Sequence, residues 1–167
     1  AFNEGNNPNR VAGIIMQQLL GQDAQQLAYN SYVLGEDVMN NYWRTGLYAG
    51  VLRSADVMVD KAVEDGRPFY EAVGKIIMAN ELGKATACFG DMPFSQAFDT
   101  DNLQPGYDTQ EAIYGSVQTL LTEAINTLNA GGGGYFGGDL IYGGDVASWV
   151  KVAHAFKARY HMHVSKR

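Results

Sequence analysis

The sequence predicts an all-α protein built from antiparallel helix pairs of tetratricopeptide-like type, with long glycine-rich loops between them. Apolar residues recur at the three- and four-residue spacing of one helix face through most of the chain. No stretch alternates apolar and polar residues strongly enough to predict a strand. The 20 glycines are too many for a plain helical bundle, so long connections are expected between roughly five helices.

The first third of the chain contains one short and one long predicted helix. We expect the asparagine-rich first ten residues to form a polar lead-in, followed by a helix over about 11–20 that ends at Gly21. The stretch 22–37 fits either a short helix or an exposed loop. A longer helix is predicted over about 38–63, because its apolar residues from Leu47 to Ala62 keep helical period.

A second long helix is predicted over about 68–89. Pro68 suits its first turn, and Gly90-Asp91-Met92-Pro93 stops it, since proline cannot continue a helix. Small residues on this helix predict a tight antiparallel hairpin with the preceding helix. They are Ala72, Ala79, Gly83 and Ala87, with Ile76 between them.

Two more helices are predicted in the last third. After a loop over 95–107, Asp108 and Glu111 have capping-box spacing at the start of a helix that reaches about Leu128. A glycine-rich connection over 131–144 holds Tyr135, Phe136 and Tyr142. Asp145 can cap the last helix, and one face of that helix carries Trp149, Ala153, Phe156 and Tyr160.

Length and charge exclude several classes of protein. A chain of 167 residues suits one helical domain over residues 1–167. The net charge of −6, without clustered Lys and Arg, argues against nucleic acid as a partner. No run approaches the length of a membrane span, and we expect no signal peptide in this stretch. The last helix runs to Lys166-Arg167 without a stop, so we expect a fragment of a larger protein.

Residues suited to catalysis or metal binding are sparse. Cys88 has no partner cysteine, and its small neighbours predict a buried thiol. The three histidines, His154, His161 and His163, lack the four-residue spacing of a helical metal pair. The glycine run from Gly131 lacks the ending of a phosphate-binding loop. We therefore expect no metal, no cofactor and no enzyme activity.

Four segments, in order, resemble the SusD/RagB family, in its SusD-like branch. The first runs from Tyr42 to Tyr48 and on to Asp56. The second is Phe89-Gly90-Asp91-Met92-Pro93-Phe94, and the third is Tyr107 to Tyr114. The fourth runs from Asp139 and Tyr142 through Trp149-Val150-Lys151 to Tyr160, with His154 where the family usually has asparagine.

The resemblance covers about residues 40–166 and implies an outward-facing lipoprotein of the outer membrane. Such a protein would bind an oligosaccharide or another polymer-derived nutrient and cap a SusC-type TonB-dependent transporter. The family's lipid-modified cysteine and its long C-terminal half are both missing from this sequence. The chain would therefore reach the membrane only through a lipid anchor that it does not itself contain.

A ligand site is predicted where aromatic and amide side chains gather near the start of the long helix. An apolar ring face suits the C–H face of a sugar, and amides supply hydrogen bonds. The candidate residues are Tyr29, Tyr32, Asn40, Asn41, Tyr42 and Trp43. Packing at a helix entry is the competing interpretation of this cluster, and Trp149 is expected to serve packing through its place on the core face.

Two rival functions stay open at this point. The helices could bind only other proteins, as tetratricopeptide-type scaffolds do. Less favoured is a carbohydrate-active hydrolase that uses the carboxylates of the connecting region, which are Asp91, Asp99, Asp101 and Asp108.

Overall fold

The computed structural model describes residues 2–131, 135 and 137–166, and the chain divides into two compact units, residues 1–50 and 51–167. Every regular element of the described residues is a helix, and the one β-type pairing is an isolated antiparallel bridge between Met92 and Asp108. The all-α fold class predicted from the sequence is confirmed.

Unit 1–50 begins with helix α1, Phe2–Ile15, so the predicted polar lead-in is wrong. The helix also ends earlier than predicted. Gln17 takes the left-handed φ of 57°, and the N–H groups of Gln18 and Leu19 both donate to the Gly13 carbonyl, at 2.9 and 3.0 Å. This turn satisfies the end of the helix before Gly21 is reached.

The stretch 22–37 contains a short helix, α2, Ala24–Asn30, capped by Asp23. Its Tyr29 is buried with Val11 and Ile14 of α1, and Ile15, Val38 and Met39 pack around them. This small cluster forms the core of the described part of the first unit. A 3₁₀ turn, η1, Glu36–Met39, then leads into the long helix.

The long helix predicted over 38–63 is present, but its first half is wound differently from its second. Residues Asn41–Leu52 form a π-helix, η2, with i→i+5 hydrogen bonding, and α3, Arg53–Glu64, continues as an α-helix. The buried positions Tyr42, Leu47 and Leu52 recur every five residues, a spacing that fits the wider turn. The prediction is thus correct in extent and wrong in helix type.

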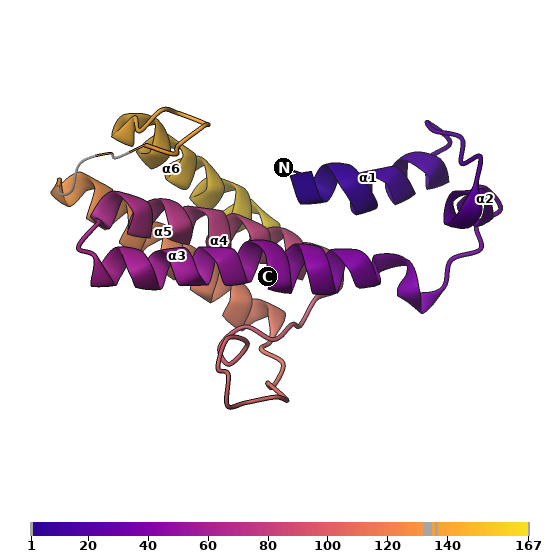
Figure 1. Cartoon of the computed structure of the whole chain (residues 1–167), viewed down its shortest axis with the longest axis horizontal. Helices are drawn as coiled ribbons and strands as arrows, with labels where there is room; N and C mark the ends of the chain where they lie inside the picture. Colours follow the sequence, from indigo (N-terminus) through magenta and orange to yellow (C-terminus); the bar gives the residue numbers. More distant parts are fainter. Residues whose placement is uncertain (1, 132–134, 136, 167) are drawn as a thin grey trace. The chain divides into compact units, whose positions relative to one another are not determined.

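Unit 51–167 is organised around helix α4, Pro68–Phe89, whose bounds agree with the prediction. Helix α5, Gln110–Ala130, lies alongside it, with α3 beside it as well, and α6, Val146–His163, packs on α4 and α5 (Figure 1). Core positions of α4 such as Ala72, Ile76 and Leu82 are fully buried. The predicted hairpin of α3 and α4 is confirmed.

The two glycines inside α4 permit close approach to two different partners. A Cβ on Gly74 would lie 2.8 Å from Cγ2 of Val59 on α3. A Cβ on Gly83 would lie 2.3 Å from ring carbons of Tyr160 on α6, whose hydroxyl donates to the Asn80 carbonyl at 2.8 Å. The small residues of α4 therefore serve α6 as well as α3.

The prediction that Cys88 is buried is wrong, because this residue lies in the last turn of α4. Cys88 is exposed, together with its neighbours Ala87 and Phe89. Small neighbours in sequence predicted burial, but this turn is the end of the helix, where Gly90 follows with a φ of 77°. Because the residues on both sides are exposed as well, the thiol is accessible to solvent.

The loop after α4 projects away from the helices (Figure 1) and is held by Asp108, which was predicted to cap α5. Thr109 is the actual cap and accepts from the Ala112 N–H at 3.2 Å. The Asp108 carboxylate instead accepts from the N–H groups of Phe94 and Ser95, both at 2.8 Å. Desolvation would raise its pKa, but these hydrogen bonds outweigh that effect and lower it.

The glycine-rich connection before α6 is held by Asp139, and its residues 132–134 and Phe136 lie outside the described residues. One Asp139 oxygen accepts from the N–H groups of Ile141 and Tyr142, and the other from Gly144 N–H and Trp149 Nε1 at 2.9 and 2.8 Å. Asp145 caps α6 as predicted. Trp149 is buried, which confirms that it serves packing.

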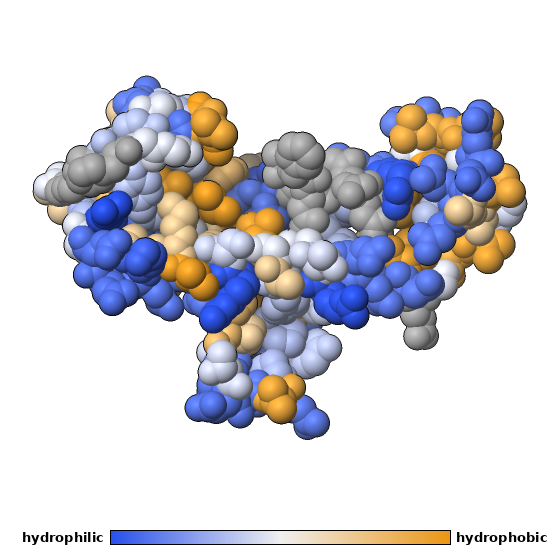
Figure 2. All heavy atoms as spheres, viewed as in Figure 1, coloured by the Kyte–Doolittle hydropathy of each residue, from blue (hydrophilic) through white to orange (hydrophobic). Residues whose placement is uncertain are grey.

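The Asp139 hydrogen bonds leave an apolar tip at the surface. Leu140 is 97% exposed and Ile141 64% exposed, although both follow directly after the best-anchored residue of the connection. Figure 2 shows apolar atoms at the surface over this connection. Their exposure does not arise from a loosely held segment.

We predict that Gly83→Ala destabilises the protein by about 1–3 kcal/mol, because its Cβ would meet the Tyr160 ring. Gly115→Ala on α5 is the matched control, since a Cβ there meets nothing within 4 Å. It should be neutral or stabilise by about 0.5–1 kcal/mol, as alanine suits a helix better than glycine. Chemical denaturation of both variants measures this, and equal losses would contradict the assigned close approach.

Asp139→Asn is predicted to lower stability by about 1–2 kcal/mol at neutral pH, through loss of charge-assisted hydrogen bonds. Desolvation would raise the pKa of Asp139, but the four hydrogen bonds lower it from 3.8 to about 2. Because the folded-state pKa is depressed, this stabilisation is present above pH 4 and is lost as pH falls toward 2. The difference between wild type and variant should therefore shrink in that window, and a constant difference would refute the role.

Candidate functional site

A pocket of about 650 Å³ lies on the η2 helix and the residue before it. Its described lining consists of Asn40, Asn41, Trp43, Arg44 and Tyr48, all from unit 1–50. Small-molecule sites in proteins span roughly 300–1,000 Å³. The pocket is therefore large enough for one or two sugar rings or another ligand of that size.

The π-helical winding of η2 accounts for the way these side chains meet. In an α-helix, neighbours on one face are three and four residues apart, whereas the wider π turn brings residues five apart together. Trp43 and Tyr48 are five apart, and their rings meet edge to face with centroids 5.2 Å apart and planes at 61°. The aromatic pair is thus a product of this helix type.

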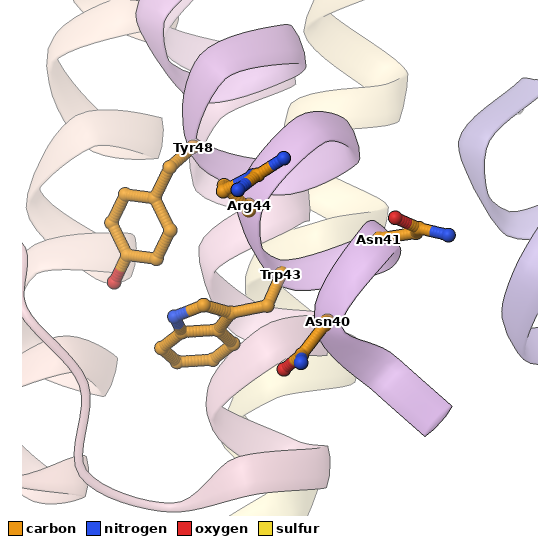
Figure 3. Close-up of a pocket in the computed structure, with 5 residues that line it drawn as sticks. All are labelled: Asn40, Asn41, Trp43, Arg44 and Tyr48. Carbon is orange, nitrogen blue, oxygen red and sulfur yellow. The ribbon is translucent and has the colours of Figure 1, made fainter. Parts of the chain in front are cut away.

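The side chains around the aromatic pair are polar. In Figure 3 the rings of Trp43 and Tyr48 extend to the same side of the helix, and the Asn40 amide lies next to the indole. Asn41 extends to the other side, and Arg44 lies between it and the aromatic rings. Trp43 and Tyr48 are each half-buried, so the rings are supported by the protein while part of their surface stays accessible.

The structure brings together three of the six predicted site residues. Asn40, Asn41 and Trp43 line the pocket. The remaining three lie outside its described lining: Tyr29 is buried in the α1–α2 core, Tyr42 is buried at 5% exposure, and Tyr32 is exposed. The Tyr32 hydroxyl accepts from Gln17 Nε2 at 3.0 Å, so it contacts the end of α1.

Two lining residues, Arg44 and Tyr48, were missing from the sequence-based set. Asn40, Arg44 and Tyr48 follow one another at four-residue intervals, and that spacing could have identified them. The prediction instead stopped at Trp43, because it took the aromatic and amide residues at the helix entry without following them along the helix. The five-residue recurrence of Tyr42, Leu47 and Leu52 was the available signal for the helix type.

The loop carboxylates considered for hydrolysis have structural partners. Asp91 accepts from the Gln110 N–H at 2.8 Å, Asp99 accepts from the Asp101 N–H at 3.0 Å, and Asp108 holds the Phe94–Ser95 backbone. These hydrogen bonds fix turns of the loop. Asp91, Asp99 and Asp108 thus have roles in the fold that need no substrate.

The histidines lie on α6, away from the Trp43 pocket in sequence. His163 Nδ1 is 3.0 Å from the Tyr114 hydroxyl, near the end of the helix, and His154 is exposed. Across residues 2–131, 135 and 137–166, no three His, Cys, Asp or Glu side chains form a group that could hold a metal ion. Within the same residues, none of the helices has the length and apolar character needed to cross a membrane.

Comparison with known proteins identifies relatives for this arrangement of helices. The SusD-like family described as starch-binding and associating with the outer membrane matches the chain over residues 1–167. The comparison with curated protein sequences found no match.

Among solved structures, a SusD/RagB family protein from Bacteroides thetaiotaomicron VPI-5482 is 27% identical, with a TM-score of 0.77 over 92% of this chain and 33% of its own. A chitin-binding protein is also 27% identical, with a TM-score of 0.77 over 98% of this chain and 36% of its own. A chitin-binding SusD homolog from Flavobacterium johnsoniae, 21% identical, shares the fold with a TM-score of 0.74 over 99% of this chain and 39% of its own.

The chain thus spans between 33% and 39% of the length of these three structures. The family match, in contrast, extends over the whole sequence, and the SusD/RagB resemblance seen in the four sequence segments is confirmed. The helical protein described above belongs to the SusD-like family.

Proposed function

We propose that this protein binds a glycan at the bacterial surface and passes it to a TonB-dependent outer-membrane transporter of the SusC type. The observation that carries the proposal is the η2 pocket, where the Trp43–Tyr48 pair lies beside the Asn40 amide (Figure 3) and where Asn41 and Arg44 complete the described lining. The family's description as starch-binding, and the chitin-binding proteins among the solved structures, support a glycan as the ligand.

The pocket has the two kinds of contact that a sugar needs. Aromatic rings present apolar faces to the C–H groups of a pyranose, while polar groups on the same side chains or beside them bond to hydroxyls. The amides of Asn40 and Asn41 each offer both donors and an acceptor. Ring support and hydrogen bonding therefore lie within one pocket.

The transporter would contact a separate surface. Neighbouring exposed apolar side chains can contribute to a protein–protein interface. Leu140 and Ile141 are such neighbours, and the hydrogen bonds of Asp139 fix the backbone on which they lie. We assign this apolar tip to the transporter interface.

The proposed location is the outer membrane, with the protein facing outward and attached through a lipid anchor outside this chain. The family's association with the outer membrane supports it. We further propose that residues 1–167 are one helical domain, the N-terminal region of a larger protein. The share of each relative that the chain covers supports this proposal.

A binding role is preferred to hydrolysis, because the carboxylates Asp91 and Asp108 are engaged by backbone N–H groups of the loop. A scaffold that binds only proteins would not account for the Trp43 pocket. Binding of oligosaccharide without release of reducing ends is therefore the expected behaviour.

We predict that Trp43→Ala lowers glycan affinity about tenfold, that is by about 1.4 kcal/mol, while the melting temperature of the free protein changes little. Affinity is measured by titration calorimetry with maltohexaose and chitohexaose, after a thermal-shift screen in which a bound glycan raises the melting temperature. Full affinity after loss of the indole would contradict the assigned pocket.

Two control variants separate binding from folding. Trp149→Ala should cost about 3–5 kcal/mol of stability, because it empties a buried site and removes a hydrogen bond to Asp139. Tyr32→Ala removes an exposed phenol outside the pocket lining and should leave affinity unchanged. If Tyr32→Ala lowered glycan affinity as much as Trp43→Ala does, the binding site would have to include residues next to α2.

The double variant Leu140→Asp, Ile141→Asp is predicted to weaken association with the transporter at least tenfold, since charges would enter a desolvated interface. Leu103→Asp is the matched control, because Leu103 is 91% exposed on the loop between α4 and α5. Co-purification with the transporter from outer-membrane extracts measures association. If the double variant and Leu103→Asp were recovered with the transporter in equal amounts, Leu140 and Ile141 would not be part of the interface.

A further inference from the structure

We propose that the η2 pocket selects glycans that carry a negatively charged group, a carboxylate or a sulfate, and that Arg44 is the residue that pairs with it. The inference rests on the proposed glycan-binding function and specifies the substrate class of the same site. It starts from the one charged side chain in the described lining, since the others are two amides, an indole and a phenol.

Arg44 has neither a hydrogen bond nor an ion pair within the part of the chain that the structure describes. Two other cations, Arg53 and Lys75, pair with carboxylates of the protein. Arg53 Nη1 lies 2.7 Å from Asp56 Oδ2, and Lys75 Nζ lies 2.8 and 2.9 Å from carboxylate oxygens of Glu71 and Glu123. Within the described side chains of a protein with a net charge of −6, the Arg44 guanidinium pairs with no carboxylate, so its donors are available to a ligand.

The position of Arg44 suits a charged substituent on a stacked sugar. Figure 3 places its side chain between the aromatic rings and Asn41. Because Arg44 and Trp43 line the same pocket, a sugar lying against Trp43 would share that pocket with the guanidinium. Its planar fork of five N–H donors matches the two oxygens of a carboxylate, or the oxygens of a sulfate, in a bidentate pair.

A neutral glycan would not need this arrangement. Hydroxyl groups are satisfied by amides, which accept and donate, whereas a guanidinium only donates. No carboxylate is present in the described lining to repel an anion or to compete for the guanidinium. The charge of the pocket therefore favours an acidic glycan over a neutral one of equal shape.

The test compares ligands that differ only in charge. The carboxylate arm uses tetragalacturonate and its fully methyl-esterified form, and the sulfate arm uses a chondroitin sulfate tetrasaccharide and its desulfated form. Maltohexaose serves as the neutral reference. Affinities of the full protein are measured by titration calorimetry at low and at physiological salt, because a partly exposed ion pair weakens as salt rises.

The variants change the charge of the pocket or of a matched site outside it. Arg44→Gln removes the charge and keeps a hydrogen-bonding chain, and Arg44→Lys keeps the charge but loses the bidentate fork. Arg53→Gln makes the same change in net charge at the exposed pair with Asp56, outside the described lining. Circular dichroism of each variant verifies that the helices are intact.

We expect at least one charged ligand to bind about five- to tenfold more tightly than its neutral form, with the preference lost in Arg44→Gln, partly kept in Arg44→Lys and unchanged in Arg53→Gln. The preferred arm identifies the group as carboxylate or sulfate. Equal affinity of charged and neutral forms, or a preference that Arg53→Gln abolishes equally, overturns the inference. If maltohexaose still binds through Trp43 in that case, glycan binding stands while charge selection fails. Failure of all ligands to bind removes both proposals.

Discussion

Burial of α4 on several sides is the constraint on which the unit 51–167 depends. The helix can be reached by α3 and α6 only because Gly74 and Gly83 have no side chains where those helices approach. Tyr160 then fills the space at Gly83 and donates its hydroxyl to the Asn80 carbonyl. At the other end of α6, Asp139 holds Trp149 and the turn that starts the helix. The connection between α5 and α6 can be rich in glycine because a few anchored residues fix its end.

The proposed site depends on a different constraint, the winding of η2. Burial of Tyr42, Leu47 and Leu52 at five-residue spacing is compatible with the wide π turn. The same turn sets Trp43 against Tyr48 and aligns Arg44 with them, so the pocket and the buried side of the helix have a common cause. π-Helical segments are rare and often occur at functional sites, because a less favourable helix type is retained where it positions side chains.

Features with a local physical cause could be predicted from the sequence. Pro68 and Gly90 mark the two ends of α4, and Asp145 caps α6, because each acts on backbone groups within a few residues. Predictions failed where the cause lay farther away or where two residues competed for one role. Thr109 caps α5, which frees Asp108 to hold the loop. Within the proposed site, Trp43 and the two asparagines could be found from their chemistry, and Arg44 and Tyr48 from their four-residue spacing after Asn40. The contact between Trp43 and Tyr48, which are five residues apart, could not be predicted from an α-helical period.

The central claim is that a glycan binds in the Trp43 pocket, and an NMR titration that follows the two indole N–H signals tests it most directly. The chain has 2 tryptophans, so their indole signals can be assigned with one variant. Titration with an oligosaccharide that binds the protein should shift the NMR signals of the Trp43 indole N–H and of the side-chain amides of Asn40 and Asn41. The Trp149 indole, which is buried and donates to Asp139, should stay unchanged. A saturable shift at other residues, with Trp43 and both asparagines unmoved, would contradict the account.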